Sequence, residues 1–213
     1  MKNNELNEQP RNLSRRGLLL GGAAGLGAAA AIGIDRAVST SPSSTQPVTH
    51  GEQTEPFYGT HQAGIATAPQ AHATFYGFDL LDDVDRDGLR RMMRLLTDDG
   101  ARLTQGRAAL ADSEPELAEV PARLTITFGF GPEFVRRADP SAVPPWLKPL
   151  PEFTIDRLQP SWSDGDFLIQ VAADDPLTVS HASRMLLKDV RTFASLRWTQ
   201  KGFRRAHGSE KVG

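Results

Sequence analysis

The residues of this chain best suited to coordination chemistry are its five histidines, because the sequence contains no cysteine. Without cysteine there can be no disulfide, no thiolate metal site and no cysteine nucleophile. No spacing among the histidines resembles that of a metal cluster, and the sequence therefore predicts no metal site. The five are His50, His61, His72, His181 and His207.

Two of these histidines have a context that could indicate iron ligation. His61 lies in the segment HQAGI, which has no carboxylate or second histidine at ligand spacing, so we expect it to anchor a loop. His181 is followed one helical turn later by Met185. A helix would place both side chains on one side, where they cannot bind one iron from opposite sides. We therefore expect both residues to pack in the domain. His50 and His207 fall in a predicted linker and tail, and His72 opens a predicted strand.

Two other segments could suggest chemistry but have simpler interpretations. Residues 129–132, GFGP, lack the Lys-Ser/Thr pair of a phosphate-binding loop, and Pro132 removes a donor N–H, so they predict a turn that ends a strand. The serines within residues 39–44 have no histidine or aspartate context for a nucleophile. The sequence therefore gives no support for hydrolase chemistry.

Length and charge limit the class of protein. The chain has 213 residues, of which 23% are charged and 39% hydrophobic, as expected for one globular domain. Its formal net charge is -2, which leaves no basic excess to bind a phosphate backbone. Nucleic acid is therefore not expected as a partner.

The N-terminus has the organisation of an export signal. Arg15 and Arg16 precede an uncharged run over residues 18–34 that is made largely of glycine and alanine. Paired arginines in this position are typical of the twin-arginine pathway, so residues 1–38 are predicted to be a signal peptide and the protein to be periplasmic or extracellular. A membrane anchor is the alternative, but the run is short for a bilayer core of about 30 Å. After cleavage no stable membrane span is expected.

Residues 39–56, rich in Ser, Thr, Pro and Gln, predict a flexible linker.

The rest of the chain predicts an α+β domain. Aromatic or alternating apolar residues indicate strands, and apolar residues spaced by three and four indicate helices. The expected strands are 73–80, 123–130, 167–173 and 195–199, and the expected helices are 86–106 and one that begins after the Asp175-Pro176 cap. Residues 140–160 hold many prolines and predict a long surface excursion. The order β-α-β-β-α-β favours a ferredoxin-like fold, a four-stranded antiparallel sheet with two helices on one face.

Three segments carry a family resemblance. They are residues 57–70, FYGTHQAGIATAPQ; residues 165–176, GDFLIQVAADDP; and residues 197–203, RWTQKGF. In this order they resemble the N-terminal half of secreted dye-decolorising (DyP-type) haem peroxidases of the deferrochelatase kind. The resemblance implies a haem b enzyme built from two ferredoxin-like halves, which uses hydrogen peroxide to oxidise dyes and phenols. Some members are credited with releasing iron from haem.

The resemblance also implies where the catalytic residues should be. In the family the distal aspartate lies in a G-x-x-D-G motif, followed by an arginine and an axial histidine, and this sequence contains no such motif. Its nearest counterpart, residues 163–166, predicts a turn. We therefore expect no catalytic, haem-binding or metal-binding residue in this chain and no peroxidase turnover by the chain alone. Five aromatic residues could relay electrons from a buried haem to dyes, but most are expected to pack in the domain: Trp146, Trp162, Trp198, Tyr58 and Tyr76.

The predicted organisation places the domain at residues 57–205 and the start of a linker to a missing haem-binding half at residues 206–213. That missing half is the first expected partner, and iron-uptake proteins are the second. An apolar face left open by its absence would make the chain self-associate as a homo-oligomer. The alternative is a non-catalytic exported module for binding or interaction, since the ferredoxin-like fold serves many functions.

Overall fold

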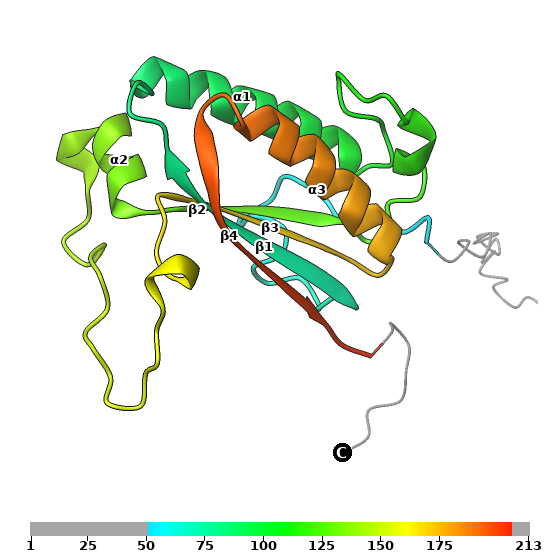
Figure 1. Ribbon diagram of the computed structural model, residues 1–213. Coiled ribbons are helices and arrows are strands. Elements are labelled where there is room, and N and C mark those ends of the chain that lie inside the picture. Colours follow the sequence, from blue (N-terminus) through cyan, green and yellow to red (C-terminus); the bar gives the residue numbers. More distant parts are fainter. Residues whose placement is uncertain (1–50, 206–213) are drawn as a thin grey trace, which may run out of the picture. The chain divides into compact units, whose positions relative to one another are not determined.

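Four strands pair into one antiparallel sheet at the centre of the fold (Figure 1). They are β1 His72–Leu80, β2 Thr125–Phe130, β3 Phe167–Ala173 and β4 Ala194–Phe203, in the spatial order β2-β3-β1-β4. Helix α1 Arg86–Leu103 connects β1 to β2, and helix α3 Pro176–Val190 connects β3 to β4. The computed structural model describes residues 51–205. The predicted β-α-β-β-α-β order and ferredoxin-like fold are confirmed.

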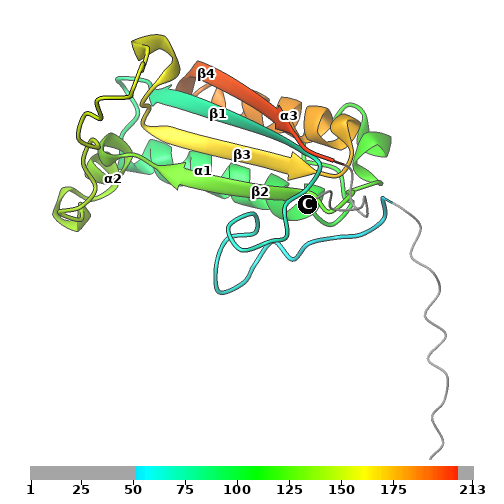
Figure 2. The same ribbon diagram turned by 90° about the horizontal axis from the view of Figure 1, so that it is seen from below.

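Both long helices cover the same face of the sheet (Figures 1 and 2). The strands send large apolar side chains toward the helices because alternate residues of a strand point to the same face. The core between the two layers is almost fully buried and includes Phe78, Phe167, Ile169 and Val171 from the sheet and Met92, Leu96, Leu186 and Val190 from the helices. Side-chain packing between these layers therefore fixes the sheet and the helices against each other.

Each long helix begins at an aspartate that the sequence marks clearly. The side chain of Asp85 accepts the backbone N–H of Gly88 at 2.8 Å, and that of Asp175 accepts the N–H of Leu177 at 2.8 Å. Pro176 occupies the first turn of α3, where its missing N–H costs nothing. These caps satisfy donors that the helix itself leaves free, which is why both predicted helix starts are correct.

The starts of β1 and β4 lie one residue earlier than predicted, at His72 and Ala194, and three other predicted boundaries differ by more. Helix α1 ends at Leu103, before Gly106, whose φ of +70° ends the helical conformation. Strand β2 begins at Thr125 because Ala122 and Arg123 have φ values of 46° and 58°, which no strand accommodates. Strand β4 continues to Phe203, since its whole length pairs with β1.

One short helix was not expected. Residues 129–132 do not merely end β2: Gly131 caps helix α2 Pro132–Ala138, and Pro132 is its first residue. The side chain of Arg137 holds α2 in place by donating to the carbonyl oxygens of Leu81 at 2.6 Å and Val84 at 3.2 Å. Gly131 is required because a Cβ atom there would lie 2.6 Å from the carbonyl oxygen of Gly165.

The proline-rich excursion is confirmed. After α2 the chain leaves the domain as a long loop, coloured yellow-green to yellow in Figure 1. Only two short 3₁₀ turns, Pro140–Ala142 and Pro160–Trp162, interrupt it, and another, Pro115–Ala118, lies between α1 and β2. Residues 163–166 form the bend into β3, as expected, with Asp164 and Gly165 at positive φ.

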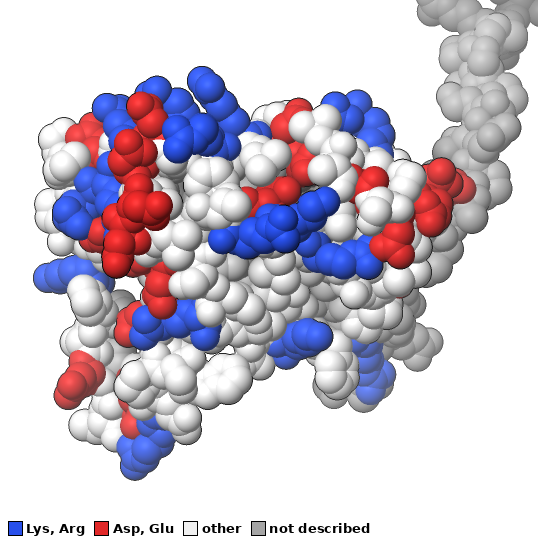
Figure 3. All heavy atoms as spheres, turned by 45° about the horizontal axis from the view of Figure 1, so that its top comes forward, with Lys and Arg blue, Asp and Glu red and all other residues white. Residues whose placement is uncertain are grey.

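The predicted signal peptide at 1–38, residues 39–50 of the predicted linker at 39–56, and the tail at 206–213 lie outside the described residues. Within residues 51–205 no helix has both the length and the apolar character to cross a bilayer. Over the helical side of the domain, acidic and basic side chains are interspersed (Figure 3). On this face, basic side chains therefore have acidic neighbours (Figure 3).

Candidate functional site

The histidines of the described part lie in three separate places. His61 is exposed in the segment before the sheet, His72 is the first residue of β1, and His181 is buried in α3. His50 and His207 lie outside the described residues. Across residues 51–205, no group of three or more histidines and carboxylates is arranged to hold a metal ion. The fold therefore does not bring these candidate ligands together.

His181 is paired with a carboxylate that lies far away in the sequence. Its Nε2 is 3.0 Å from Oδ2 of Asp112, and the two side chains are 2% and 1% exposed. Burial raises the pKa of Asp112, but the hydrogen bond from the Glu114 N–H and the proximity of His181 and Arg184 outweigh it, so this pKa lies below its usual value. The pair fastens the loop after α1 to α3. Together with Met185, buried in the core, it confirms the packing interpretation of this stretch.

Haem is the cofactor that the resemblance implies, and the described histidines do not fit it. An axial histidine is normally oriented by a hydrogen bond from its second ring nitrogen, while the first nitrogen faces the iron. His61 and His72 make no side-chain hydrogen bond within the described part, and the Nε2 of His181 faces Asp112 instead of a cavity. These residues therefore supply no axial ligand, and no chemical step can be assigned to them.

The segment before the sheet seals an exposed strand edge. Strand β2 lies at one side of the sheet, and Gln62 meets it as a neighbouring peptide would: its Oε1 accepts the N–H of Phe128 and its Nε2 donates to the carbonyl of Phe128, both at 2.9 Å. The hydroxyl of Thr127 donates to the carbonyl of Ala63 at 2.6 Å. An edge covered in this way cannot pair with another chain. His61, which was expected to anchor the loop, makes none of these contacts; Gln62 anchors it instead.

Arg123 ties the same segment to the domain. Its guanidinium contacts Glu55 at 2.9 Å, Asp174 at 3.1 Å and the carbonyl oxygen of Ala68 at 2.9 Å. The Arg123 carbonyl oxygen accepts the side-chain amide of Gln70 at 3.0 Å. A single buried arginine thus joins the segment that resembles the family to the end of β3. This gives the segment a structural role.

Of the five aromatic residues considered for electron transfer, two pack in the domain and three are largely exposed. Tyr76 is in the core, and Trp198 lies against Gly77, where an added Cβ atom would be 2.4 Å from the indole ring. The Nε1 of Trp198 donates to the carbonyl oxygen of Asp164 at 2.7 Å. The other three are largely exposed: Trp146 at 74%, Trp162 at 60% and Tyr58 at 71%. The prediction that most of the five pack in the domain is wrong.

A second buried polar pair lies between the two long helices. Asp99 of α1 is 2% exposed and Asp189 of α3 is 9% exposed. Asp99 accepts the backbone N–H of Leu110 at 2.8 Å through Oδ1, whereas Oδ2 of Asp189 is buried without a protein hydrogen bond. Burial, then the charge of Asp99 and a hydrogen bond with it, raise the pKa of Asp189 to about 7. Nothing in the sequence marked these two residues as neighbours.

The sheet order and the helices on one face define a ferredoxin-like α+β domain. The chain matches the family described as "Dyp-type peroxidase, N-terminal" over residues 62–204. It belongs to this family, and the matched part is the family's N-terminal domain. The resemblance inferred from the three sequence segments is confirmed.

Individual relatives agree with this assignment. The deferrochelatase of Escherichia coli O157:H7 is 35% identical over 94% of this chain and 50% of its own length. The DyP-type peroxidase of Cellulomonas bogoriensis is 49% identical, with a TM-score of 0.74 over 76% of this chain and 45% of its own. DtpA from Streptomyces lividans, solved as an oxyferrous complex, is 35% identical to this chain. The TM-score is 0.72, and the match covers 78% of this chain and 46% of DtpA. The chain thus spans about half the length of the curated relatives it matches.

Proposed function

We propose that this chain is the N-terminal half of an exported haem-dependent peroxidase, and that a second half supplies the haem ligand and the residues that act on peroxide. The reaction would be oxidation of dyes and phenols by hydrogen peroxide, or release of iron from haem, as the name of the deferrochelatase relatives indicates. A Rhodococcus jostii member of the fold was solved in complex with heme. The observation that carries the proposal is the family match over a chain about half the length of its relatives.

The predicted signal peptide at residues 1–38 supports the proposal that the protein is exported. The twin arginines at Arg15 and Arg16 would direct export in a folded state, which suits a protein whose cofactor is inserted before transport. Periplasmic or extracellular oxidation of substrates would follow. Fusing residues 1–56 to a reporter that is active only after export would test this, with Arg15→Lys and Arg16→Lys together as the variant expected to block it.

Exposed apolar residues indicate where a second half would pack. The excursion between α2 and β3 presents large hydrophobic side chains to solvent: Trp146, Leu150, Phe153, Ile155, Leu158 and Trp162, each more than half exposed. A group of large exposed apolar side chains is typical of an interface. We place the contact with the haem-binding half on this excursion, and association with iron-uptake proteins would be a further step of the assembled enzyme.

The chain alone is expected to lack peroxidase activity. Haem added to the purified 213-residue chain should give no stoichiometric Soret band and no oxidation of a phenol beyond that of free haem, because the described part provides no axial ligand. Absorption spectroscopy and a peroxide assay measure both. A stoichiometric band with turnover would overturn the proposal of a separate haem-binding half.

A chimera separates the peroxidase proposal from the alternative of a non-catalytic module. Residues 57–205 would replace the matching N-terminal domain of the Cellulomonas bogoriensis peroxidase, to which the chain is 49% identical. A working peroxidase domain should leave the chimera with a Soret band and activity within about tenfold of the parent, since the haem half is unchanged. A chimera that binds haem but has lost its activity would favour the non-catalytic module.

Removing apolar side chains from the excursion is expected to reduce self-association. Leu150 and Ile155 are 83% and 86% exposed, so Leu150→Ser with Ile155→Ser should leave the core intact and shift the chain toward monomer. Leu110→Ser, at a 61% exposed leucine elsewhere on the surface, is the matched control. Light scattering over a range of concentrations gives the mass. A clean monomer of the unaltered chain at high concentration would contradict the expectation.

A further inference from the structure

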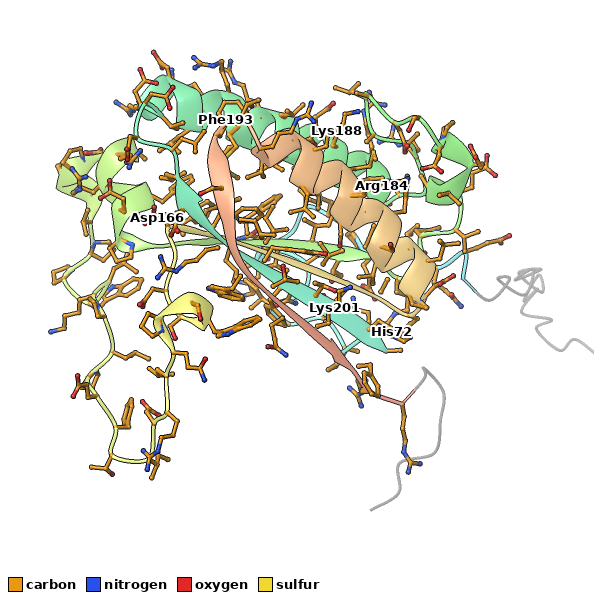
Figure 4. The ribbon with its side chains drawn as sticks, in the orientation of Figure 1. His72, Asp166, Arg184, Lys188, Phe193 and Lys201 are labelled. Carbon is orange, nitrogen blue, oxygen red and sulfur yellow. The ribbon has the colours of Figure 1, made fainter. Side chains whose placement is uncertain are left out.

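A groove lies between α3 and the ends of β1 and β4, on the side of the sheet that the helices cover. Its volume is about 510 Å³, which is within the range of small-molecule sites. Strand β4 is the outermost strand on this side, so the helix that packs over β1 and β3 leaves a space beside it. Figure 4 shows Arg184 on α3, with Lys201 and His72 on the two strands below it.

The floor of the groove contains hydroxyl groups that have no partner in the described part of the chain. Thr74 and Ser183 are each 4% exposed and Tyr76 is 7% exposed, and all three line the groove. The Oγ of Ser183 is fully buried and makes no hydrogen bond. A serine within a helix usually bonds the carbonyl of the preceding turn, but Ser183 does not. An unpaired buried hydroxyl costs about 1 to 3 kcal/mol, which a bound molecule with a hydrogen-bonding group would offset.

The charges around the groove are all of one sign. Lys201 and Arg184 line it together with His72, and no aspartate or glutamate does. Arg184 also forms an ion pair with Glu114 on its outer side. The ammonium group of Lys201 forms no ion pair or hydrogen bond with a described residue, so it is available to an anion, whereas the backbone carbonyl of Lys201 accepts the side-chain amide of Gln200. The groove therefore favours a negatively charged group at its rim.

The walls of the groove are apolar. Val179 and Leu187 of α3 line one side, and Phe203 of β4, 88% exposed, lies at the mouth. Apolar walls, hydroxyl groups on the floor and a lysine at the rim together match a ligand with a flat hydrophobic body, a hydrogen-bonding substituent and a carboxylate. A ligand with only one of these features would leave part of the groove unmatched.

We propose that the α3–β4 groove is a binding site for small organic carboxylates with an apolar ring body. Lys201 binds the carboxylate, and Ser183 and Thr74 bind a hydroxyl or carbonyl group at the other end of the ring. All of the residues that line this site belong to this chain.

The test is a calorimetric titration of the full 213-residue chain with a hydroxynaphthoate, and with naphthol as the uncharged analogue. Saturable binding of one equivalent is expected for the carboxylate. Naphthol, and the carboxylate on Lys201→Gln, should bind about tenfold more weakly, because each loses one charge-assisted hydrogen bond. Lys148→Gln, at an exposed lysine in the excursion, is the matched control and should bind as the unaltered chain does.

Ser183→Ala distinguishes a ligand-binding role from a structural one. Because Ser183 has no hydrogen bond within the described chain, its removal should leave the thermal midpoint equal or higher while weakening hydroxynaphthoate binding about fivefold. Binding that is unchanged in both Lys201→Gln and Ser183→Ala would overturn the proposal. So would the absence of saturation at millimolar carboxylate, or an affinity that depends on protein concentration, which would indicate a second copy in the groove.

Discussion

Replacing Arg123 by methionine is expected to lower the free energy of unfolding by about 3 to 5 kcal/mol, because buried carboxylates lose their cation. Arg123 is 8% exposed and contacts Asp174 at 3.1 Å and Glu55 at 2.9 Å. The side chain of Asp174 is only 7% exposed, so water cannot replace the guanidinium without local opening. Methionine keeps an unbranched apolar stem like that of arginine. The decrease in the free energy of unfolding therefore measures the contribution of the guanidinium group.

Urea unfolding of the variant and two controls measures this effect. Arg102→Met removes an exposed ion pair with Asp98 on α1, and its cost should stay below about 1 kcal/mol. Adding Asp174→Asn to Arg123→Met should recover part of the loss, since the uncompensated buried charge is then gone. A loss no larger than that of Arg102→Met would show that the buried network contributes little.

The same variant should free the segment before the sheet. Arg123 holds residues 51–70 through Glu55 and the Ala68 carbonyl oxygen, and its own carbonyl oxygen accepts the side-chain amide of Gln70. Segments that open locally are cleaved by proteases before the domain unfolds. Limited proteolysis of Arg123→Met should therefore cut this segment earlier than in Arg102→Met.

The parts of the fold that the sequence predicted well depend on neighbouring residues. The limits of β3 and the start of α3 were correct because a run of apolar residues is followed directly by the Asp175 cap and Pro176. Both features act within one or two turns of the chain, so a single sequence contains all the information they need.

Elements that depend on distant partners could not be predicted in this way. Strand β4 was expected to end at Thr199, because Lys201 and Gly202 lack the alternation of a buried strand, yet pairing with β1 extends it to Phe203. Helix α2 is short and begins at a Gly-Pro pair, which also fits a turn. What stabilises it is the contact of Arg137 with the loop before α1.

The polar contacts of the domain were the least predictable part. Asp112 with His181, Asp99 with Asp189, and Gln62 with Phe128 each join elements that are far apart in the chain. A sequence shows that an aspartate is present, but only the packing of α1 on α3 shows that two of them are buried together. The α3–β4 groove has the same origin, since its hydroxyl groups come from β1 and α3.

The pair of buried aspartates makes the stability of the domain depend on pH in an unusual direction. Burial, followed by the charge of Asp99, raises the pKa of Asp189 from 3.8 to about 7, and Lys188 opposes this only in part. Between pH 3.8 and about pH 7, Asp189 is therefore protonated in the folded chain to a greater extent than in the unfolded chain. The stabilisation is therefore complete below about pH 4 and is lost as the pH rises through about 7.

Asp189→Asn is expected to remove this dependence. From about pH 5 to about pH 8 the free energy of unfolding of the unaltered chain should fall by about 1 to 3 kcal/mol more than that of the variant. Without screening by water, the difference in the pKa of Asp189 between the folded and unfolded chain would correspond to about 4 kcal/mol. The asparagine stays neutral and can donate a hydrogen bond to Asp99, so the variant should be the more stable protein at the higher pH. Urea unfolding at the two pH values measures the difference.

The control is Asp98→Asn, which removes an exposed carboxylate on α1, next to Asp99 in the sequence, that pairs with Arg102. Its stability should follow the pH dependence of the unaltered chain, because the carboxyl group of Asp189 is still present. The other titratable groups are common to all three proteins, so their contributions cancel in the comparison. Parallel curves for the unaltered chain and Asp189→Asn would mean that water reaches Asp189 in the folded domain, and that the gap between α1 and α3 is open rather than closed at this point.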